Sequence, residues 1–385
     1  MNRPLSIAIV TGSFPKLSET FVLHQIVSLL SAGHDVRVFA FDKPVEAAIH
    51  EEVGRFQLLE RTTYLKSPRH ITSRFSALLR RLTRQSPERF DAIVCHFGTN
   101  GEKARLFRAQ GCFDGPLAVI FHAADLTVWL REKPPGFYTK LFEEAALLLP
   151  ISRHWQDLLT ELGAPPSKVV VRHMGVDTAA LSYQERRIGP QAPLRLMSVA
   201  RLVEKKGIEY ALEALALARP KLGRPFEYYI VGDGPLRQSL EARAQALGLG
   251  LGTEVRFVGS LENNRVKELM GSMHALLAPS VTAKNGDKEG IPVALMEAMA
   301  LGLSVFSTQH SGIPELVRHA ETGYCTPERD ASALATALVG WANAPETWPA
   351  VTARARQLVE SEFDARSLTS ALVSDLQALA ERRDA

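Results

Sequence analysis

Short apolar runs alternate with helical patterns along the whole chain. Residues 7–10 and 36–40 are apolar and strand-like, and the segment 20–32 between them repeats its apolar positions with helical spacing. Alternation of this kind predicts βαβ units around a parallel sheet. The same pattern predicts further strands at 92–96, 118–122, 147–150 and 169–171.

A second series of the same kind begins after a polar segment, 181–193, which ends in Gly-Pro-Gln-Ala-Pro and is typical of a linker. The strands predicted beyond it are 194–199, 228–231, 255–258, 275–278 and 305–307, and the helices are 207–218, 235–247, 292–301, 331–341, 350–362 and 365–382. We therefore expect an α/β protein with two doubly wound domains in tandem, 1–180 and 194–364. The carboxyl ends of their strands are expected to face a central cleft.

Composition narrows the classes of function. The chain has 385 residues, of which 46% are hydrophobic, enough for two cores. A formal net charge of +3 gives no reason to expect nucleic-acid binding. The cysteines lack ligand spacing and there is no Asp-x-Asp or His-x-x-x-His motif, so no metal is expected. No apolar run suits a signal peptide or a membrane span, which predicts a cytoplasmic protein.

Two carboxylates on either side of a predicted helix start give the strongest chemical signal. Glu289 precedes the helix and Glu297 falls in its second turn, with Pro292 at the first helical position and Gly302 at the end. The free N–H groups around residues 290–293 carry the positive end of the helix dipole, which suits a phosphate. Carboxylates beside a phosphate suit hydroxyl groups, so this stretch predicts a nucleotide-sugar site.

Two cations follow the first strand of the second domain. Arg201 comes directly after that strand, and Lys206 lies just before the next helix. Such a pair at a strand's carboxyl end can hold a diphosphate. Taken alone, a solvated loop is the simpler interpretation, because Glu204 and Lys205 are charged as well. The Glu289 stretch on a neighbouring strand end favours binding.

Glycines and histidines at other strand ends add weaker signals. Gly232, in Val-Gly-Asp-Gly-Pro, lets a ligand approach the backbone, although a tight turn alone would also explain it. Gly12 follows the first strand without a Gly-x-Gly-x-x-Gly fingerprint, which disfavours a dinucleotide cofactor. His96 and His122 each end a strand, a position that is often structural. His122, followed by Ala-Ala-Asp125, is the stronger candidate for chemistry.

Residues 61–84 form a separate basic segment. They include seven Lys or Arg and no acidic residue, with apolar side chains at helical spacing. This pattern predicts a basic amphipathic helix. It would either rest on an anionic membrane or pack on the first domain's sheet with its arginines in solvent.

Together these motifs resemble those of the family 4 glycosyltransferases, retaining enzymes of the GT-B fold. The most specific are the Glu289 to Glu297 element, Arg201 with Lys206 in Val-Ala-Arg-Leu-Val-Glu-Lys-Lys-Gly, and Val-Gly-Asp-Gly-Pro. The segments Phe-Pro-Lys-Leu-Ser-Glu-Thr-Phe at 14–21 and His-Phe-Gly-Thr-Asn-Gly at 96–101 are similar to a bacterial exopolysaccharide branch that includes colanic-acid-type transferases.

The resemblance implies a role for each candidate residue. Arg201 and Lys206 would hold the donor diphosphate, Glu297 the ribose hydroxyls, and Glu289 the hydroxyls of the transferred sugar. His122 would lie near that sugar, and the last helix, 365–385, would cross back onto the first domain. The remaining donor-site residues implied are Gly12, Gly232, Val258, Gly259, Gly290, Ile291, Pro292 and Val293. Relatives often have Gly-Gly where this chain has Gly12-Ser13, and Gly after the histidine where it has Ala123.

The expected reaction is transfer of a hexose from a nucleoside-diphosphate sugar to a hydroxyl group, with retention and without metal or cofactor. A UDP-hexose is favoured as donor, and GDP-mannose comes second. The acceptor would be a glycan or a lipid-linked oligosaccharide in exopolysaccharide biosynthesis. The alternatives are a nucleotide-sugar epimerase of the same fold, a sugar phosphorylase, and a non-catalytic partner of another glycosyltransferase.

Overall fold

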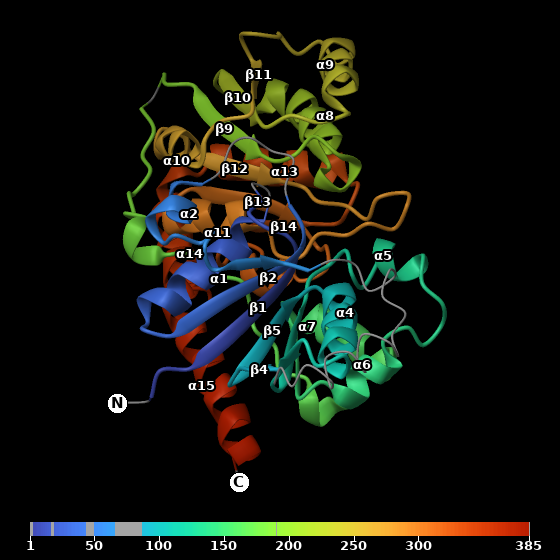
Figure 1. Ribbon diagram of the computed structural model, residues 1–385. Coiled ribbons are helices and arrows are strands. Elements are labelled where there is room, and N and C mark those ends of the chain that lie inside the picture. The colour runs from blue at the N-terminus through green and yellow to red at the C-terminus, as the bar shows by residue number, and fades with distance from the viewer. Residues whose placement is uncertain (1–2, 17–18, 44–49, 66–86, 190, 385) are drawn as a thin grey trace. The chain divides into compact units, whose positions relative to one another are not determined.

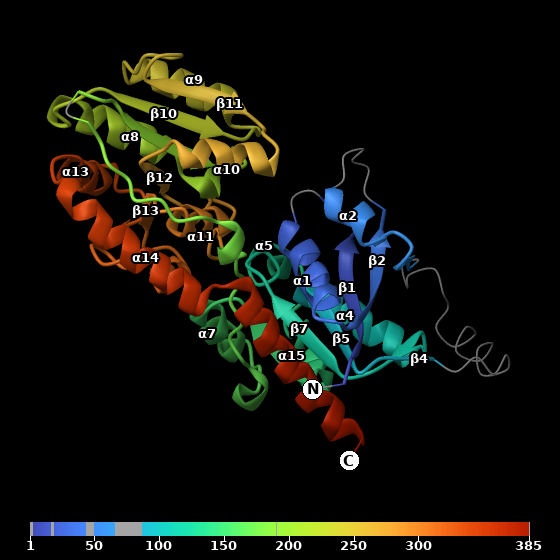
Figure 2. The same cartoon turned by 90° about the vertical axis from the view of Figure 1, so that its left-hand side faces the viewer.

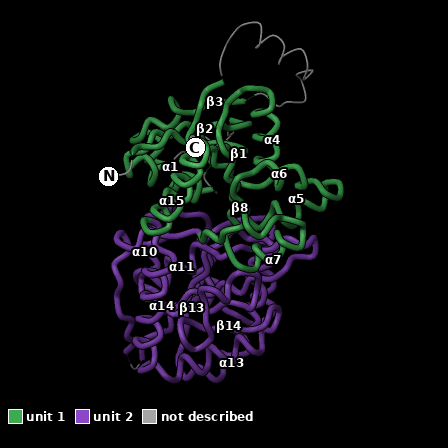
Figure 3. The backbone as a smooth tube through the Cα atoms, turned by 90° about the horizontal axis from the view of Figure 1, so that it is seen from below, with its two compact units in different colours: residues 1–173, 366–385 green, residues 174–365 purple. Residues whose placement is uncertain are grey.

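The computed structural model describes residues 3–16, 19–43, 50–65, 87–189 and 191–384. The chain divides into two compact units, one of residues 1–173 with 366–385 (unit 1) and one of residues 174–365 (unit 2) (Figure 3). The division falls after residue 173. The segment 181–193, for which we predicted a linker, is grouped with unit 2, and the last helix is grouped with unit 1.

Unit 1 is built, within its described residues, on a six-stranded parallel sheet (Figure 1). In spatial order the strands are β3 (Thr62–Tyr64), β2 (Asp35–Asp42), β1 (Ser6–Ser13), β5 (Ala92–His96), β7 (Leu117–Phe121) and β8 (Leu147–Pro150). Strands β5 and β7 are buried along their whole length, as expected for apolar runs with helices on both faces. The strand order reverses between β1 and β5, which makes the sheet doubly wound. A short two-stranded sheet joins β4 (Glu88–Arg89) to β6 (Phe113–Asp114).

The helices of unit 1 connect these strands and include the last helix of the chain. They are α1 (Thr20–Ser31), α2 (Glu51–Arg55), α4 (Gly98–Ala109), α5 (Val128–Arg131), α6 (Thr139–Glu144), α7 (Arg153–Glu161) and α15 (Ala365–Asp384). Helix α15 lies against the rest of unit 1 (Figure 2). An ion pair between Arg172 and Asp375, whose N and O atoms are 2.8 Å apart, fixes it to this unit. Leu372 and Leu376 of α15 are buried.

Unit 2 repeats the same topology. Its described residues form a second six-stranded parallel sheet, in the order β11 (Val255–Gly259), β10 (Phe226–Val231), β9 (Leu194–Val199), β12 (Ala275–Ala278), β13 (Ser304–Thr308) and β14 (Tyr324–Thr326). The order reverses between β9 and β12, so the loops that follow these two strands diverge to opposite sides of the sheet. A gap of this kind at the carboxyl ends of parallel strands is where ligands bind in doubly wound sheets.

Helices cover both faces of the second sheet. They are α8 (Ile208–Ala218), α9 (Arg237–Ala246), α10 (Asn263–Gly271), α11 (Val293–Ala300), α12 (Ile313–Leu316), α13 (Ala331–Ala342) and α14 (Trp348–Glu362). Side chains alternate between the two faces: Leu194 and Leu196 of β9 join a core with α8, α9 and α13, whereas Met197 joins one with α10, α11 and α14. The second core holds α11 firmly against the sheet, and this helix positions Glu297.

Several boundaries differ from the sequence prediction. The run 169–171 is not a strand of the sheet: Val169 makes only an isolated bridge to Leu148, because β8 ends in Pro150, which has no N–H to extend the ladder. Helix α11 begins at Val293 and not at Pro292, whose ψ of 127° is extended and makes it the N-cap. Gly12 lies inside β1, which continues to Ser13 beside β2.

The basic segment is only partly described. Residues 62–64 form strand β3 at the edge of the first sheet, so this part of the segment 61–84 is not helical. Residues 66–86, which carry most of the predicted amphipathic helix, lie outside the described residues. Of the helices that the structure describes, none combines the length and the apolar character needed to cross a bilayer.

Candidate functional site

A polar pocket of about 420 Å³ opens in unit 2 beside the carboxyl ends of β9 and β12. The loop after β9 contributes its cations and one carboxylate, Glu204, and the loop after β12 contributes the carboxylates of Asp287 and Glu289. The residues that line it are Arg201, Val203, Glu204, Lys205, Lys206, Ala283, Asn285, Asp287 and Glu289. The structure thus brings together three of the predicted residues, Arg201, Lys206 and Glu289, at the point where the strand order reverses.

Glu289 is held by two ammonium groups. Lys206 Nζ lies 2.6 Å from one carboxylate oxygen, and Lys205 Nζ lies 3.2 Å from the other. Glu289 is 9% exposed, and burial alone would raise its pKa, but Lys206 and Lys205 lower it to about 2. The carboxylate is therefore ionised at any physiological pH and fixed in direction. It can accept hydrogen bonds from hydroxyl groups but has no proton to give.

A single glycine lets the two loops meet. Gly207 has a φ of +62°, and a Cβ at this position would lie 1.9 Å from the carbonyl oxygen of Pro279. Only glycine combines this backbone conformation with so close an approach. The three residues before it form a short 3-10 turn, Glu204–Lys206, which directs Lys206 into the pocket.

Lys205 and Asp287 complete the charge arrangement. Lys205 Nζ lies 3.1 Å from Asp287 as well as 3.2 Å from Glu289, so it bridges two carboxylates of the same loop. Burial would lower the pKa of Lys205, but Glu289 and Asp287 raise it. Sequence reasoning missed both residues, because a lysine in a charged loop gives no signal until the opposing loop is placed.

The start of α11 lies next to Glu289. Helix α11 begins at Val293, after the loop residues Gly290 and Ile291 and the N-cap Pro292. The first N–H groups of any helix have no carbonyl partner within the helix. Glu297, in the second turn, has a side chain that is 13% exposed and is 3.9 Å from Lys267 Nζ. Burial raises the pKa of Glu297, and Lys267 lowers it only in part. Glu297 is not among the residues that line the pocket.

The glycine turn after β10 has a packing explanation. Gly232 has a φ of +124°, and a Cβ there would lie 2.0 Å from the carbonyl oxygen of Ala200. Its N–H donates to the carbonyl of Gly259, and Val258 is 38% exposed. These three residues do not line the 420 Å³ pocket, so the geometry assigns the glycine requirement at 232 to backbone packing.

His122 belongs to a buried cluster at the strand ends of unit 1. Its Nε2 lies 3.3 Å from Nδ1 of His96, and the rings of Phe21 and Phe97 pack against it. Burial, and then the neighbouring His96, lower the pKa of His122 well below its usual value. Burial lowers the pKa of His96 to about 3. Both rings are therefore neutral. One of the two facing nitrogens carries a hydrogen and donates a hydrogen bond to the other.

Asp125 and Gly12 lie at the same edge of the first sheet, where its strands have their carboxyl ends. Asp125 accepts a hydrogen bond of 2.7 Å from the N–H of Gly98 at the start of α4. Burial nevertheless raises the pKa of Asp125 to about 8, against the lowering effect of its backbone hydrogen bonds. Gly12 faces Asn100, and a Cβ on Gly12 would clear it by 3.6 Å. No steric need for glycine at 12 is therefore evident in unit 1.

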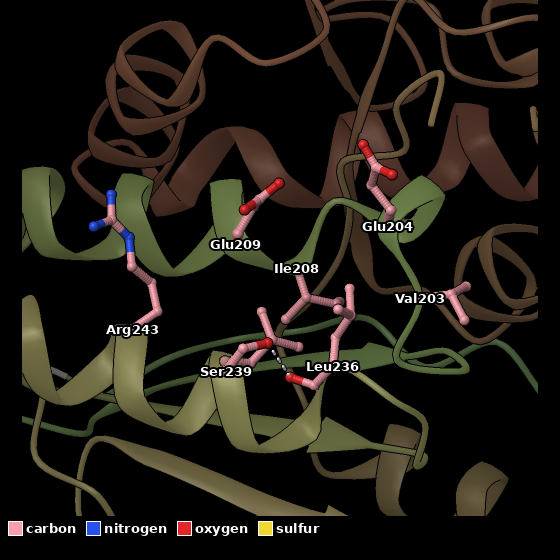
Figure 4. Close-up of a pocket in the computed structure, with 8 residues that line it drawn as sticks. Val203, Glu204, Ile208, Glu209, Leu236, Ser239 and Arg243 are labelled. Carbon is pink, nitrogen blue, oxygen red and sulfur yellow. Dashed lines mark hydrogen bonds between the residues drawn. The ribbon is translucent and has the colours of Figure 1, made fainter. Parts of the chain in front are cut away.

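A second pocket of unit 2, of about 180 Å³, lies between α8 and α9 (Figure 4). Half of its lining residues are aliphatic and half are polar or charged: Val203, Glu204, Ile208, Glu209, Leu236, Ser239, Leu240 and Arg243. The guanidinium of Arg243 is paired with Glu213 at 2.7 Å. This pocket shares Val203 and Glu204 with the first one but has neither Lys206 nor Glu289, so its chemistry is different.

Comparisons with known proteins agree with this arrangement of units. The family model described as "Glycosyl transferases group 1" matches residues 185–357, and the one described as "Glycosyltransferase Family 4" matches residues 18–180. The chain is 36% identical to the putative colanic acid biosynthesis glycosyltransferase WcaL of Escherichia coli (strain K12), over 95% of this chain and 98% of that protein. It is 34% identical to the amylovoran biosynthesis glycosyltransferase AmsK of Erwinia amylovora, over 98% of this chain and 100% of that protein.

Solved structures show the same fold. Anabaena Alr3699/HepE in complex with UDP-glucose matches with a TM-score of 0.74 at 17% identity, over 97% of this chain and 100% of that one. WaaG, a glycosyltransferase involved in lipopolysaccharide biosynthesis, matches with a TM-score of 0.64 at 18% identity, over 96% of this chain and 99% of that one. Among the described residues, no group of three His, Cys, Asp or Glu side chains is placed to hold a metal ion.

Proposed function

Because this chain belongs to the family 4 glycosyltransferases, in their exopolysaccharide branch and with the GT-B fold, we propose that it transfers a hexose from a nucleoside-diphosphate sugar to a hydroxyl group with retention of configuration. The observation that carries this proposal is that Arg201, Lys206 and the ionised Glu289 line the same pocket. A diphosphate needs cations, and a sugar needs a hydrogen-bond acceptor next to them.

In the proposed complex, Arg201 and Lys206 bind the diphosphate, assisted by the N–H groups of Gly290, Ile291 and Val293 at the start of α11. Glu297 accepts hydrogen bonds from the ribose hydroxyls. The raised pKa of Glu297 fits this role, because a buried carboxylate with one distant cation lacks hydrogen-bond donors that hydroxyl groups can supply. Gly12, Gly232, Val258 and Gly259 would line the rest of the nucleotide site.

The proposed chemistry needs neither a metal nor a cofactor. The developing charge on the leaving diphosphate is met by Arg201, Lys206 and the helix dipole. The acceptor attacks on the face that the diphosphate leaves, and a leaving phosphate oxygen takes its proton. Glu289 orients the sugar and favours its developing positive charge, and a neutral His122 donates or accepts one hydrogen bond near the sugar.

We propose a UDP-hexose as the donor, with GDP-mannose second, and a glycan or lipid-linked oligosaccharide as the acceptor on the cytoplasmic side of the membrane. The UDP-glucose complex of the Anabaena structure supports the donor, and the names of the colanic acid and amylovoran relatives support an exopolysaccharide acceptor. Contact of the segment 61–84 with the membrane belongs to the same proposal.

The test is a screen for nucleotide release from UDP- and GDP-sugars in the presence of EDTA, with and without lipid-linked oligosaccharides. We expect release with one UDP-hexose, stimulated by acceptor, and an α-linked product from an α-linked donor. Lys206→Ala and Arg201→Ala should abolish UDP binding, whereas Glu297→Gln should weaken it. Release that stops with EDTA would refute the metal-free chemistry. Conversion of donor to an epimer without acceptor would favour an epimerase instead.

A further inference from the structure

Side chains of the loop after β13 hold the backbone of Glu289 by hydrogen bonds. The N–H of Glu289 donates to Nε2 of His310, at 2.9 Å, and Nδ1 of His310 lies 2.6 Å from Oε1 of Glu328. The carbonyl of Glu289 accepts a hydrogen bond of 2.6 Å from the hydroxyl of Ser311. Both backbone groups of Glu289 are thus bound by two consecutive residues of the loop after β13.

This geometry specifies where the proton of His310 lies. Because Nε2 accepts from an N–H group, it carries no proton, and the ring must have its proton on Nδ1. Nδ1 then donates to the carboxylate of Glu328. Protonation of Nε2 would place two donors against each other. Only the neutral Nδ1–H form satisfies both contacts, in the way that a histidine which binds a metal is oriented by a carboxylate on its other nitrogen.

The far end of this chain of hydrogen bonds is anchored as well. The second oxygen of Glu328 accepts from the N–H of Thr282, at 2.8 Å, in the loop after β12 that also carries Glu289. His310 is fully buried, and Ser311 adopts a φ of +49°, which is uncommon for a residue other than glycine. A strained serine beside a buried histidine persists where the surrounding contacts determine both conformations.

We infer that His310 and Glu328 are positioning residues that fix the direction in which Glu289 presents its carboxylate to the transferred sugar. The inference rests on the proposed function of Glu289. Arg201 takes no part in these hydrogen bonds, and Lys206 is connected to them through its ion pair with Glu289. Loss of the His310 contact should therefore lower turnover and leave the affinity for the nucleotide unchanged. A misplacement of about 1 Å at a reacting centre can lower a rate by roughly a hundredfold.

The experiment compares three substitutions in the full chain. His310→Leu removes the acceptor and keeps the volume, whereas His310→Gln can offer its amide oxygen to the Glu289 N–H. His274→Leu is the matched control, because His274 is a half-buried histidine of unit 2 that accepts the N–H of Arg195 at 2.9 Å, and His274 does not line the pocket. We measure kcat and KM for the donor, Kd for UDP by calorimetry, and stability in urea.

We expect His310→Leu to lower kcat at least about tenfold with an unchanged Kd for UDP, and His310→Gln to recover most of the loss. His274→Leu should lower stability and leave kcat unchanged. Equal kcat values for wild type and His310→Leu would overturn the inference, as would a glutamine variant no better than leucine. Where His310→Leu yields no folded protein, Glu328→Ala gives the reading: an unchanged kcat there overturns the inference too.

A direct measurement of the proton keeps the inference separate from the proposed function. Nitrogen-15 NMR of the histidines, with the His310 signals assigned by their loss in His310→Gln, should show a proton on Nδ1 and none on Nε2. The other tautomer would overturn the inference in an active enzyme. If the wild-type chain releases no nucleotide from any donor, the proposed function fails, whatever the tautomer.

Discussion

Replacement of Glu289 by glutamine separates the two functions that this carboxylate has in the pocket. In the protein without substrate, Glu289 neutralises Lys206 and Lys205. In the proposed complex, Lys206 turns to the diphosphate and Glu289 to the sugar. Glutamine keeps the size and one acceptor oxygen but removes the charge, so stability and turnover should fall while nucleotide binding is kept or becomes tighter.

The effect on stability can be worked from the pKa of Glu289, which the two lysines lower from 4.5 to about 2. At about 1.4 kcal/mol for each pH unit between these values, the ionised carboxylate contributes on the order of 3 kcal/mol to the free energy of unfolding. Glutamine retains a hydrogen bond to Lys206 worth about 1 kcal/mol. We therefore expect Glu289→Gln to lower the free energy of unfolding by about 2 kcal/mol at pH 7.

The pH dependence follows from the sign of this change. Folding lowers the pKa of Glu289, so its stabilising effect is complete above pH 4.5 and is lost as the pH falls toward 2. The difference in unfolding free energy between wild type and Glu289→Gln should shrink over that range. Urea unfolding of both proteins at pH 7, 4 and 3 measures it.

Nucleotide binding and turnover should diverge. Because Lys206 no longer has an anionic partner in the variant, the Kd for UDP should stay equal or fall. Turnover should drop by about a hundredfold or more, since a preorganised charge at the reacting sugar is lost. Asp287→Asn, which removes the other carboxylate on Lys205, is the matched control and should change turnover far less. A Glu289→Gln variant with full turnover, or with UDP binding lost in parallel with turnover, would refute this account.

Two further predictions concern the supporting structure. Gly207→Ala should lower the free energy of unfolding by more than about 2 kcal/mol in urea, because its φ is +62° and a Cβ would meet the carbonyl of Pro279. Gly223→Ala, at a φ of +68° and with the new Cβ in ordinary contact with Oδ1 of Asn343 at 3.9 Å, measures the conformational part alone. Asp125→Asn should become progressively more stable than wild type as the pH rises from about 4 to 8, since burial raises the Asp125 pKa to about 8 and its folded form is neutral below that value. If the difference in unfolding free energy between Asp125→Asn and wild type did not change across that range, burial would not raise the pKa of Asp125.

The sequence predicted most of the fold because the apolar runs of both units are distinct. Five of the strands in each sheet were placed within two or three residues of their ends, since buried parallel strands leave near-continuous apolar runs. The edge strands β3 and β14 were missed. Each has three residues, too few for a periodic pattern, and it is the neighbouring strand that holds such a segment extended.

The candidate site was predictable only in part. Arg201, Lys206 and Glu289 follow strands that meet at the reversal of the sheet order, so their proximity could be inferred from topology alone. The interpretation of Gly232 could not be decided in that way. Its small size is required by the carbonyl of Ala200, a neighbour from another strand end, and a sequence motif does not distinguish such a contact from an approaching ligand.

The contact between His310 and Glu328 shows how one missed strand conceals a functional arrangement. Strands β13 and β14 pair in parallel, with Thr308 opposite Thr326, which is an offset of 18 residues. The same offset places Glu328 opposite His310, two residues beyond the paired strands. A histidine at the end of a predicted strand and a glutamate in a presumed loop give no signal separately. Once β14 is placed, the register of the sheet itself brings the carboxylate to the ring that orients Glu289.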